Sequence, residues 1–123
     1  MASIFITGDR MFSPIYVPLV FTEMLRASVN GDIVSTGDQE GIEGIVRLIA
    51  DEVGMSIDVL PAQRGADGKV DHAVRAQMLN HPSSGVTSIV AVHADPMASS
   101  VTKALMEYAE NKVRLVSPLD LLG

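Results

Sequence analysis

Two short segments of the chain place a threonine, a glycine and an aspartate in succession directly after an apolar run. They are FITGDR, residues 5–10, and VSTGDQEGIEG, residues 34–44. Glycine lets the backbone approach a ligand closely, and the free N–H groups of a helix's first turn attract phosphate. The carboxyl ends of parallel strands gather at one rim of a sheet, so two such loops can meet there. The two segments therefore predict strand-to-helix loops that hold a phosphate-bearing small molecule.

The later segment contains what we call the second loop (residues 36–44), which combines glycines with acidic residues. Gly37 and Gly41 would let main-chain amides reach a phosphate. Asp38 and Glu43 would repel a bare phosphate, but they can accept hydrogen bonds from ribose hydroxyls or a base edge. The loop is neither a G-x-G-x-x-G fingerprint nor a P-loop with its lysine. The alternative is an ordinary glycine-rich turn in which Asp38 caps the following helix.

The earlier segment contains the first loop (residues 7–10), which contributes a cation. Arg10 follows Thr7, Gly8 and Asp9, and an arginine fork can hold a phosphate with two hydrogen bonds. Asp9 could hold or orient that arginine. The alternative is a surface Asp–Arg pair that contributes little to stability.

Further polar side chains that could bind phosphate follow the expected third strand. Gln63, Arg64 and Lys69 lie in an irregular polar stretch, and Arg75 lies on the helix after it. Arg75 is one residue beyond Val74 on the apolar side that we assign to this helix, so it should border the buried face. The alternative is an ordinary solvated arginine.

Histidines and serines give weaker signals. His93 ends the expected fourth strand, and Ser99 and Ser100 could offer hydroxyl and N–H groups to a ligand, although they also suit a helix cap. The histidines lack metal-ligand spacing, so we expect neither a metal nor a cofactor. The candidate ligand-binding residues are thus Thr7, Gly8, Asp9, Arg10, Gly37, Asp38, Gln39, Gly41, Glu43, Arg75, His93 and Ser99.

These loops need a framework of alternating strands and helices. Apolar and β-branched runs predict strands over residues 3–7, 33–36, 56–60, 87–92 and 113–116. Helical spacing predicts one helix between each pair of successive strands. In chain order, the apolar faces of these four helices are expected at Val20, Phe21, Met24 and Leu25; at Ile42, Ile45, Val46, Ile49 and Val53; at Val70, Ala73, Val74 and Met78; and at Val101, Ala104, Leu105 and Tyr108. This alternation predicts one α/β domain over residues 1–123, with a Rossmann-like, mainly parallel five-stranded sheet and helices on both faces.

Composition limits the partners. The formal net charge of -6 at pH 7, with nine scattered Lys and Arg residues, leaves no basic stripe for a nucleic-acid backbone. DNA and RNA binding are therefore not expected. No signal-peptide pattern and no apolar run of membrane-spanning length is present, so we expect a soluble cytoplasmic protein that does not bind membranes. The methionine content and the apolar tail at Leu119, Leu121 and Leu122 favour a homo-oligomer.

The order of these segments resembles the YspA-like branch of the SLOG superfamily, Rossmann-like domains related to the DprA and LOG proteins. The resemblance extends from about Ser3 to Val116, and its specific part lies in the first two loops. The family's first motif is matched by Gly8 and Arg10, and its second by Gly37 and Gly41, with Glu43 in place of an aspartate. Arg75 and Met78 resemble the family's third motif, in which Ala76 here replaces an asparagine.

The resemblance implies recognition of nucleotides or nucleotide-derived molecules, often by sensors or partners in bacterial and phage conflict systems. Residues 93–100 lack the glycine pair with which such proteins often cradle phosphate, and the P-G-G-x-G-T-x-x-E motif of LOG-type phosphoribohydrolases is absent. Ligand binding is therefore expected more than inherited catalysis.

Three functions agree with the sequence. We favour a nucleotide-binding module in which Arg10 and Arg75 meet phosphate and Glu43 or Asp38 meets ribose. One alternative is a hydrolase that cleaves an N-glycosidic or phosphate bond of a nucleotide, with Glu43 or Asp38 as acid or base. The other is a protein–protein interaction module whose glycine loops are only structural.

Overall fold

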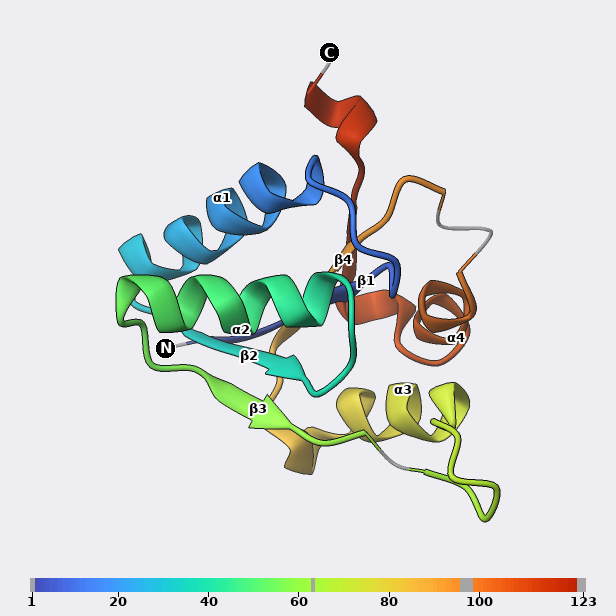
Figure 1. Cartoon of the computed structure of the whole chain (residues 1–123). Coiled ribbons are helices and arrows are strands. Elements are labelled where there is room, and N and C mark those ends of the chain that lie inside the picture. The colour runs from blue at the N-terminus through green and yellow to red at the C-terminus, as the bar shows by residue number, and fades with distance from the viewer. Residues whose placement is uncertain (1, 63, 96–98, 122–123) are drawn as a thin grey trace.

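The computed structural model describes residues 2–62, 64–95 and 99–121, in which strands and helices alternate (Figure 1). The strands are β1 (Ser3–Gly8), β2 (Ile33–Gly37), β3 (Asp58–Leu60), β4 (Ser88–Val92) and β5 (Val113–Val116). The helices are α1 (Tyr16–Val29), α2 (Ile42–Val53), α3 (His72–Asn80) and α4 (Ser100–Tyr108), with short 3-10 helices η1 (Pro82–Ser84), η3 (Glu110–Lys112) and η4 (Pro118–Leu121). Gln63 and Leu122, which the sequence analysis names, lie outside the described residues.

The sheet is parallel throughout, with the strand order β3-β2-β1-β4-β5. Figure 1 shows α1 and α2 on one face of the sheet and α3 and α4 on the other. Successive side chains of a strand point to opposite faces, so Ile6 packs with the α1 and α2 core while Phe5 packs with the α3 and α4 core. The predicted Rossmann-like α/β fold is confirmed, and the sheet is wholly rather than mainly parallel.

Strand boundaries follow the apolar pattern closely. β5 occupies the predicted residues, and β1 and β2 each extend one residue further to include a glycine. β3 is the exception, because its pairing with β2 begins at Asp58 rather than at the predicted Ser56. The edge strand β3, which pairs with β2, is therefore short.

The buried face of α1 differs from the predicted one. Val20 and Met24 are buried as expected, but Phe21 and Leu25 are 43% and 51% exposed. The helix has apolar residues on more than one flank, so spacing alone could not identify the face that meets the sheet. Glu23 lies on the buried side, because its carboxylate pairs with Arg26 and Arg114.

The buried face of α3 also differs from the predicted one. Val74 and Met78 are exposed, whereas Arg75, Ala76 and Leu79 are buried. Arg75 was expected to border the buried face and lies within it, where its pairing with the Glu43 carboxylate makes its burial tolerable. The difference matters because it turns Arg75 inward.

The buried faces of α2 and α4 agree better with the prediction. Ile42, Ile45, Val46 and Ile49 are buried, and only Val53 at the end of α2 is exposed. On α4, Val101, Ala104 and Leu105 are buried and Tyr108 packs partly against them. Among the helices of the described residues, none combines the length and apolar character needed to cross a membrane.

Candidate functional site

The first and second loops lie side by side at the carboxyl ends of β1 and β2. The backbone N–H of Ile42 donates to the carbonyl oxygen of Asp9 at 2.9 Å. Gly41 has a φ of 72°, and a Cβ at this position would overlap the backbone of Asp9 and Arg10. The glycine is therefore required by the contact between the two loops as well as by its own left-handed backbone.

A buried ion pair joins these loops to α3. Glu43 accepts hydrogen bonds from Thr7 Oγ1 at 2.5 Å, Arg75 Nη2 at 2.6 Å and the backbone N–H of Gln39 at 3.0 Å. Glu43 is 2% exposed and Arg75 is 7% exposed. We call these four residues the Glu43 cluster. It connects β1, the second loop and α3 through one carboxylate.

Gly37 makes room for the Glu43 cluster. A Cβ at this position would collide with Arg75 Nη2 and Glu43 Oε1. The second loop is also held from its other side by Arg47, whose guanidinium donates to the carbonyl oxygens of Gly37 at 2.5 Å and Gln39 at 2.9 Å. Two of the loop's glycines thus have structural roles that the sequence analysis had offered as the alternative.

Arg75 uses only part of its hydrogen-bonding capacity. Its Nη1 is buried and has no hydrogen-bond partner within the described part of the chain. The guanidinium carbon lies 5.2 Å from the centre of the Phe5 ring, a distance typical of a cation–π contact. A buried arginine N–H without a partner is costly, and His72 Nδ1 is likewise buried without a partner in the described residues.

His72 begins α3 beside Arg75. Burial lowers its pKa, and the positive charges of Arg10 and Arg75 lower it further. The positive charge of Arg10 thus acts on the start of α3, although Arg10 itself is exposed on the first loop. A cavity of about 10 Å³ is lined by Thr7, His72 and Arg75 among others, which is room for roughly one water molecule.

A different network spans the junction of β1 and β4, where the order of the strands reverses. Tyr16 donates its hydroxyl hydrogen to Asp9 Oδ2 at 2.8 Å, and the N–H of Ala94 donates to the Tyr16 hydroxyl at 3.2 Å. His93 Nε2 lies 3.6 Å from Asp9 Oδ1, and its Nδ1 accepts from the N–H of Asp95. Burial and the Asp9 carboxylate raise the pKa of Tyr16. Side chains therefore occupy the crevice in which Rossmann-like folds commonly bind ligands.

The remaining candidates have identifiable local roles. A Cβ at Gly8 would overlap the carbonyl group of Val92, so this glycine permits close approach of β1 and β4. Asp38 accepts from the side chain of Gln39 and from the N–H of Ala62, and the Gln39 hydrogen bond lowers its pKa. Ser99 caps α4 by accepting from the N–H of Thr102 at 3.2 Å.

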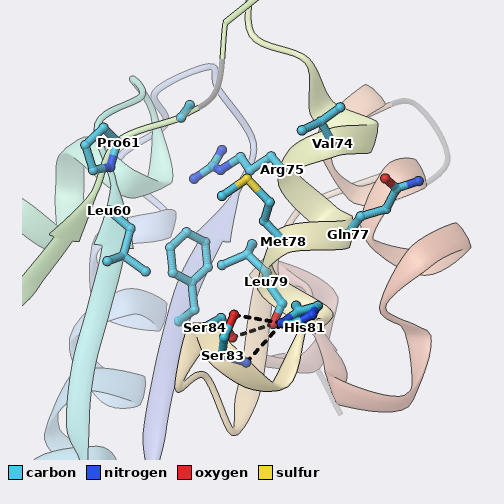
Figure 2. A pocket seen from close by; sticks show the side chains of 12 residues that line it. Leu60, Pro61, Val74, Arg75, Gln77, Met78, Leu79, His81, Ser83 and Ser84 are labelled. Atoms are coloured by element: carbon cyan, nitrogen blue, oxygen red, sulfur yellow. Dashed lines mark hydrogen bonds between the residues drawn. The ribbon is translucent and has the colours of Figure 1, made fainter.

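A cavity of about 670 Å³ lies between β3 and α3 (Figure 2). Its origin can be read from the register of the strands. On the face that meets α3, β3 presents Asp58 and Leu60 and β1 presents Phe5 and Thr7, while the part of β2 beside these residues presents Ser35 and Gly37. Two small residues on the middle strand leave space that α3 does not fill.

The cavity has apolar walls and polar ends. Leu60, Pro61 and Phe5 line it from the strands, and Val74, Met78 and Leu79 line it from α3. Figure 2 shows Arg75 reaching from α3 towards the end of β3, and His81, Ser83 and Ser84 at the opposite end. His81 Nδ1 lies 2.7 Å from Ser83 Oγ and accepts from the backbone N–H of Ser83.

The structure therefore brings the candidates together in two groups. Thr7, Gln39, Glu43 and Arg75 form the Glu43 cluster, and Asp9 and His93 meet at the junction of β1 and β4. Arg75 also lines the large cavity. The other residues of the cavity were not predicted from the sequence, although the small residues at the alternate positions Ser35 and Gly37 were a visible signal.

Comparisons with protein-family models, with curated proteins and with solved structures each found no match to this chain. Within residues 2–62, 64–95 and 99–121, no three His, Asp or Glu side chains gather as ligands of a metal would.

Proposed function

We propose that this chain binds a nucleotide or nucleotide-derived small molecule, whose ring system lies in the cavity between β3 and α3. The observation that carries the proposal is the cavity of about 670 Å³ with the buried Arg75 at one end, whose Nη1 has no partner in the described part of the chain. Small-molecule sites usually measure about 300–1,000 Å³ and combine apolar walls with a few fixed polar groups.

The walls suit a flat ring. Leu60 and Met78 approach from the strand side and the helix side, so a planar group between them would bury apolar surface on both faces. Arg75 is fixed by Glu43 and by the Phe5 ring, so it would meet the ligand without losing conformational freedom. A preorganised donor of this kind fixes the orientation of the ligand.

Two exposed arginines lie near the carboxyl ends of the strands, where a phosphate could project from the cavity. The charge of Arg10 acts on His72 at the start of α3, and that of Arg64 contributes a little to the lowered pKa of Asp38. The resemblance to the SLOG superfamily supports the same ligand class and favours a sensor or ligand-capturing role in bacterial or phage conflict.

The proposal concerns binding rather than hydrolysis. Glu43, one expected acid or base, accepts three internal hydrogen bonds and is almost fully buried. The lowered pKa of Asp38 favours its ionised form, whereas a general acid needs a proton to donate. These two observations argue against either carboxylate as a general acid, and they favour the proposal of binding over that of hydrolysis.

A thermal-shift screen tests the proposal. Nucleosides, nucleotides, cyclic nucleotides and ADP-ribose should include at least one compound that raises the melting temperature, because a ligand bound only by the folded state stabilises it. Val74→Trp should abolish this shift by filling the cavity, whereas Val53→Trp, an equivalent change of an exposed helical valine outside the cavity, should retain it. A shift that survives Val74→Trp, or no shift with any compound, would contradict the proposed site.

A further inference from the structure

We infer that the cavity recognises an uncharged nucleobase through a carbonyl oxygen that accepts from Arg75 Nη1, and that phosphate contributes little to affinity. This inference rests on the proposed function and specifies its ligand. It follows from the charge of the cavity, from the donors that it offers, and from the position of Met78.

The charge of the cavity is already balanced. Among the described residues that line the cavity, Arg75 is the only arginine or lysine, and the Glu43 carboxylate neutralises it at 2.6 Å. His81 Nδ1 is already engaged within the chain, because it accepts a hydrogen bond from the backbone N–H of Ser83. A phosphate inside the cavity would be a buried anion without a counter-charge, which is strongly unfavourable.

The free group of Arg75 is a donor only. A guanidinium has no acceptor, so the part of the ligand that faces Nη1 must present an oxygen or an unprotonated nitrogen. A carbonyl at position 6 of a purine meets this need. An amino group at the same position would place N–H against N–H, which leaves two donors unpaired.

Met78 is the wall residue of the cavity that we expect to move. It lies one helical turn after Arg75, lines the same cavity and is 48% exposed. Nη1 has almost no solvent-exposed surface, so a ligand can reach it only when a neighbouring side chain moves. Methionine is flexible and adapts to irregular shapes, so it can move aside and pack on the plane of a base.

Isothermal titration with four compounds tests the inference. Inosine and adenosine differ at position 6, and inosine 5′-monophosphate and inosine 5′-triphosphate add phosphate to the same base. We expect inosine to bind at least about tenfold more tightly than adenosine, because a site built around a hydrogen bond rejects the mismatched analogue. We expect both phosphates to bind within about threefold of inosine, with little change between low and high salt, because no desolvated ion pair is formed.

The outcomes separate the two proposals. Equal binding of adenosine and inosine, or tighter and salt-sensitive binding of the triphosphate, would overturn the inference while the proposed function stands. Binding of none of the four, together with a failed thermal-shift screen, would overturn both.

Two variants locate the contact. Arg75→Lys keeps a positive charge for Glu43 but lacks the second arm of the fork, so the preference for inosine over adenosine should fall to about twofold or less. Val74→Trp should abolish inosine binding even if Arg75→Lys fails to fold, and Val53→Trp should leave it unchanged. An undiminished preference in Arg75→Lys, or undiminished inosine binding in Val74→Trp, would also overturn the inference.

Discussion

Among single residues, Glu43 has the largest structural role in the candidate site. Its carboxylate receives donors from β1, from the second loop and from α3. The sequence analysis expected this side chain to meet ribose, and its place among three internal donors shows how a loop carboxylate can serve the fold instead. Arg75 depends on it, because a buried guanidinium needs a counter-charge.

We predict that Glu43→Gln lowers the free energy of unfolding by roughly 3 kcal/mol, because it leaves the charge of Arg75 buried without its partner. The double variant Glu43→Gln with Arg75→Met should lose clearly less than the sum of the two single variants, since removing both partners leaves no uncompensated charge. Urea denaturation of the four proteins measures this coupling. Additive losses would show that the ion pair does not act as a unit.

A second residue-scale prediction concerns pH. The pKa of His72 is lowered from its ordinary value of 6.5, mainly by burial, so the folded state binds fewer protons here than the unfolded state does. Stability from this group is therefore present above about pH 6.5 and is lost as the pH falls through that value. One proton limits the slope of stability against pH to about 1.4 kcal/mol per pH unit. Because His72 is partly exposed, the measured slope should stay below this limit.

Denaturation of the wild type and of His72→Gln between pH 7.5 and pH 5.5 measures this effect. The variant should lose less stability on acidification than the wild type, because glutamine does not take up a proton. Parallel pH profiles for the two proteins would contradict the assignment.

Among the structural elements, the contact between the first and second loops depends on Gly41. Gly41 and Gly54 have nearly the same φ, 72° and 73°, but a Cβ at Gly41 would overlap the first loop whereas a Cβ at Gly54 meets open space. Alanine at either position carries the cost of a left-handed backbone, about 1–2 kcal/mol. The pair therefore separates backbone strain from steric contact.

We predict that Gly41→Ala destabilises the protein by about 1–3 kcal/mol more than Gly54→Ala, because the added methyl group forces the two loops apart. Thermal or urea denaturation of both variants provides the comparison. Equal losses would mean that the loop contact relaxes easily and contributes little.

At the scale of the whole molecule, exposed apolar residues gather on α1 and α2. Val17, Phe21 and Leu25 repeat every four residues along one flank of α1, and Leu48 is exposed on the neighbouring helix. Leu119 is exposed as well, while the side chain of Leu121 and all of Leu122 lie outside the described part of the chain. The expected homo-oligomer therefore remains a proposal, and α1 is its best candidate interface.

We predict that sedimentation velocity detects a homo-oligomer and that Leu25→Glu shifts it towards the monomer, because a charge in the apolar stripe cannot be desolvated without cost. Gln77→Glu serves as the control, since Gln77 is exposed on α3, which lies on the opposite face of the sheet (Figure 1). A monomeric wild type, or equal effects of both variants, would reject this interface.

The sequence by itself determined the order of strands and helices, the parallel sheet and the positions of its loops. Alternating apolar runs and helical spacing are local properties, so they could be recognised without knowing which residues meet in space. The sequence also indicated that the two glycine-rich loops would lie together, because successive parallel strands end at the same rim.

Only the tertiary structure decided what those loops contain and where the cavity lies. The pairing of Glu43 with Arg75 joins residues 32 positions apart, and no local pattern predicts that partner or the inward rotation of α3. The cavity likewise arises from three neighbouring strands and one helix, because Ser35 and Gly37 become a gap only when Phe5 and Leu60 stand on either side of them. Burial and charge compensation are properties of such contacts, which the chain acquires only on folding.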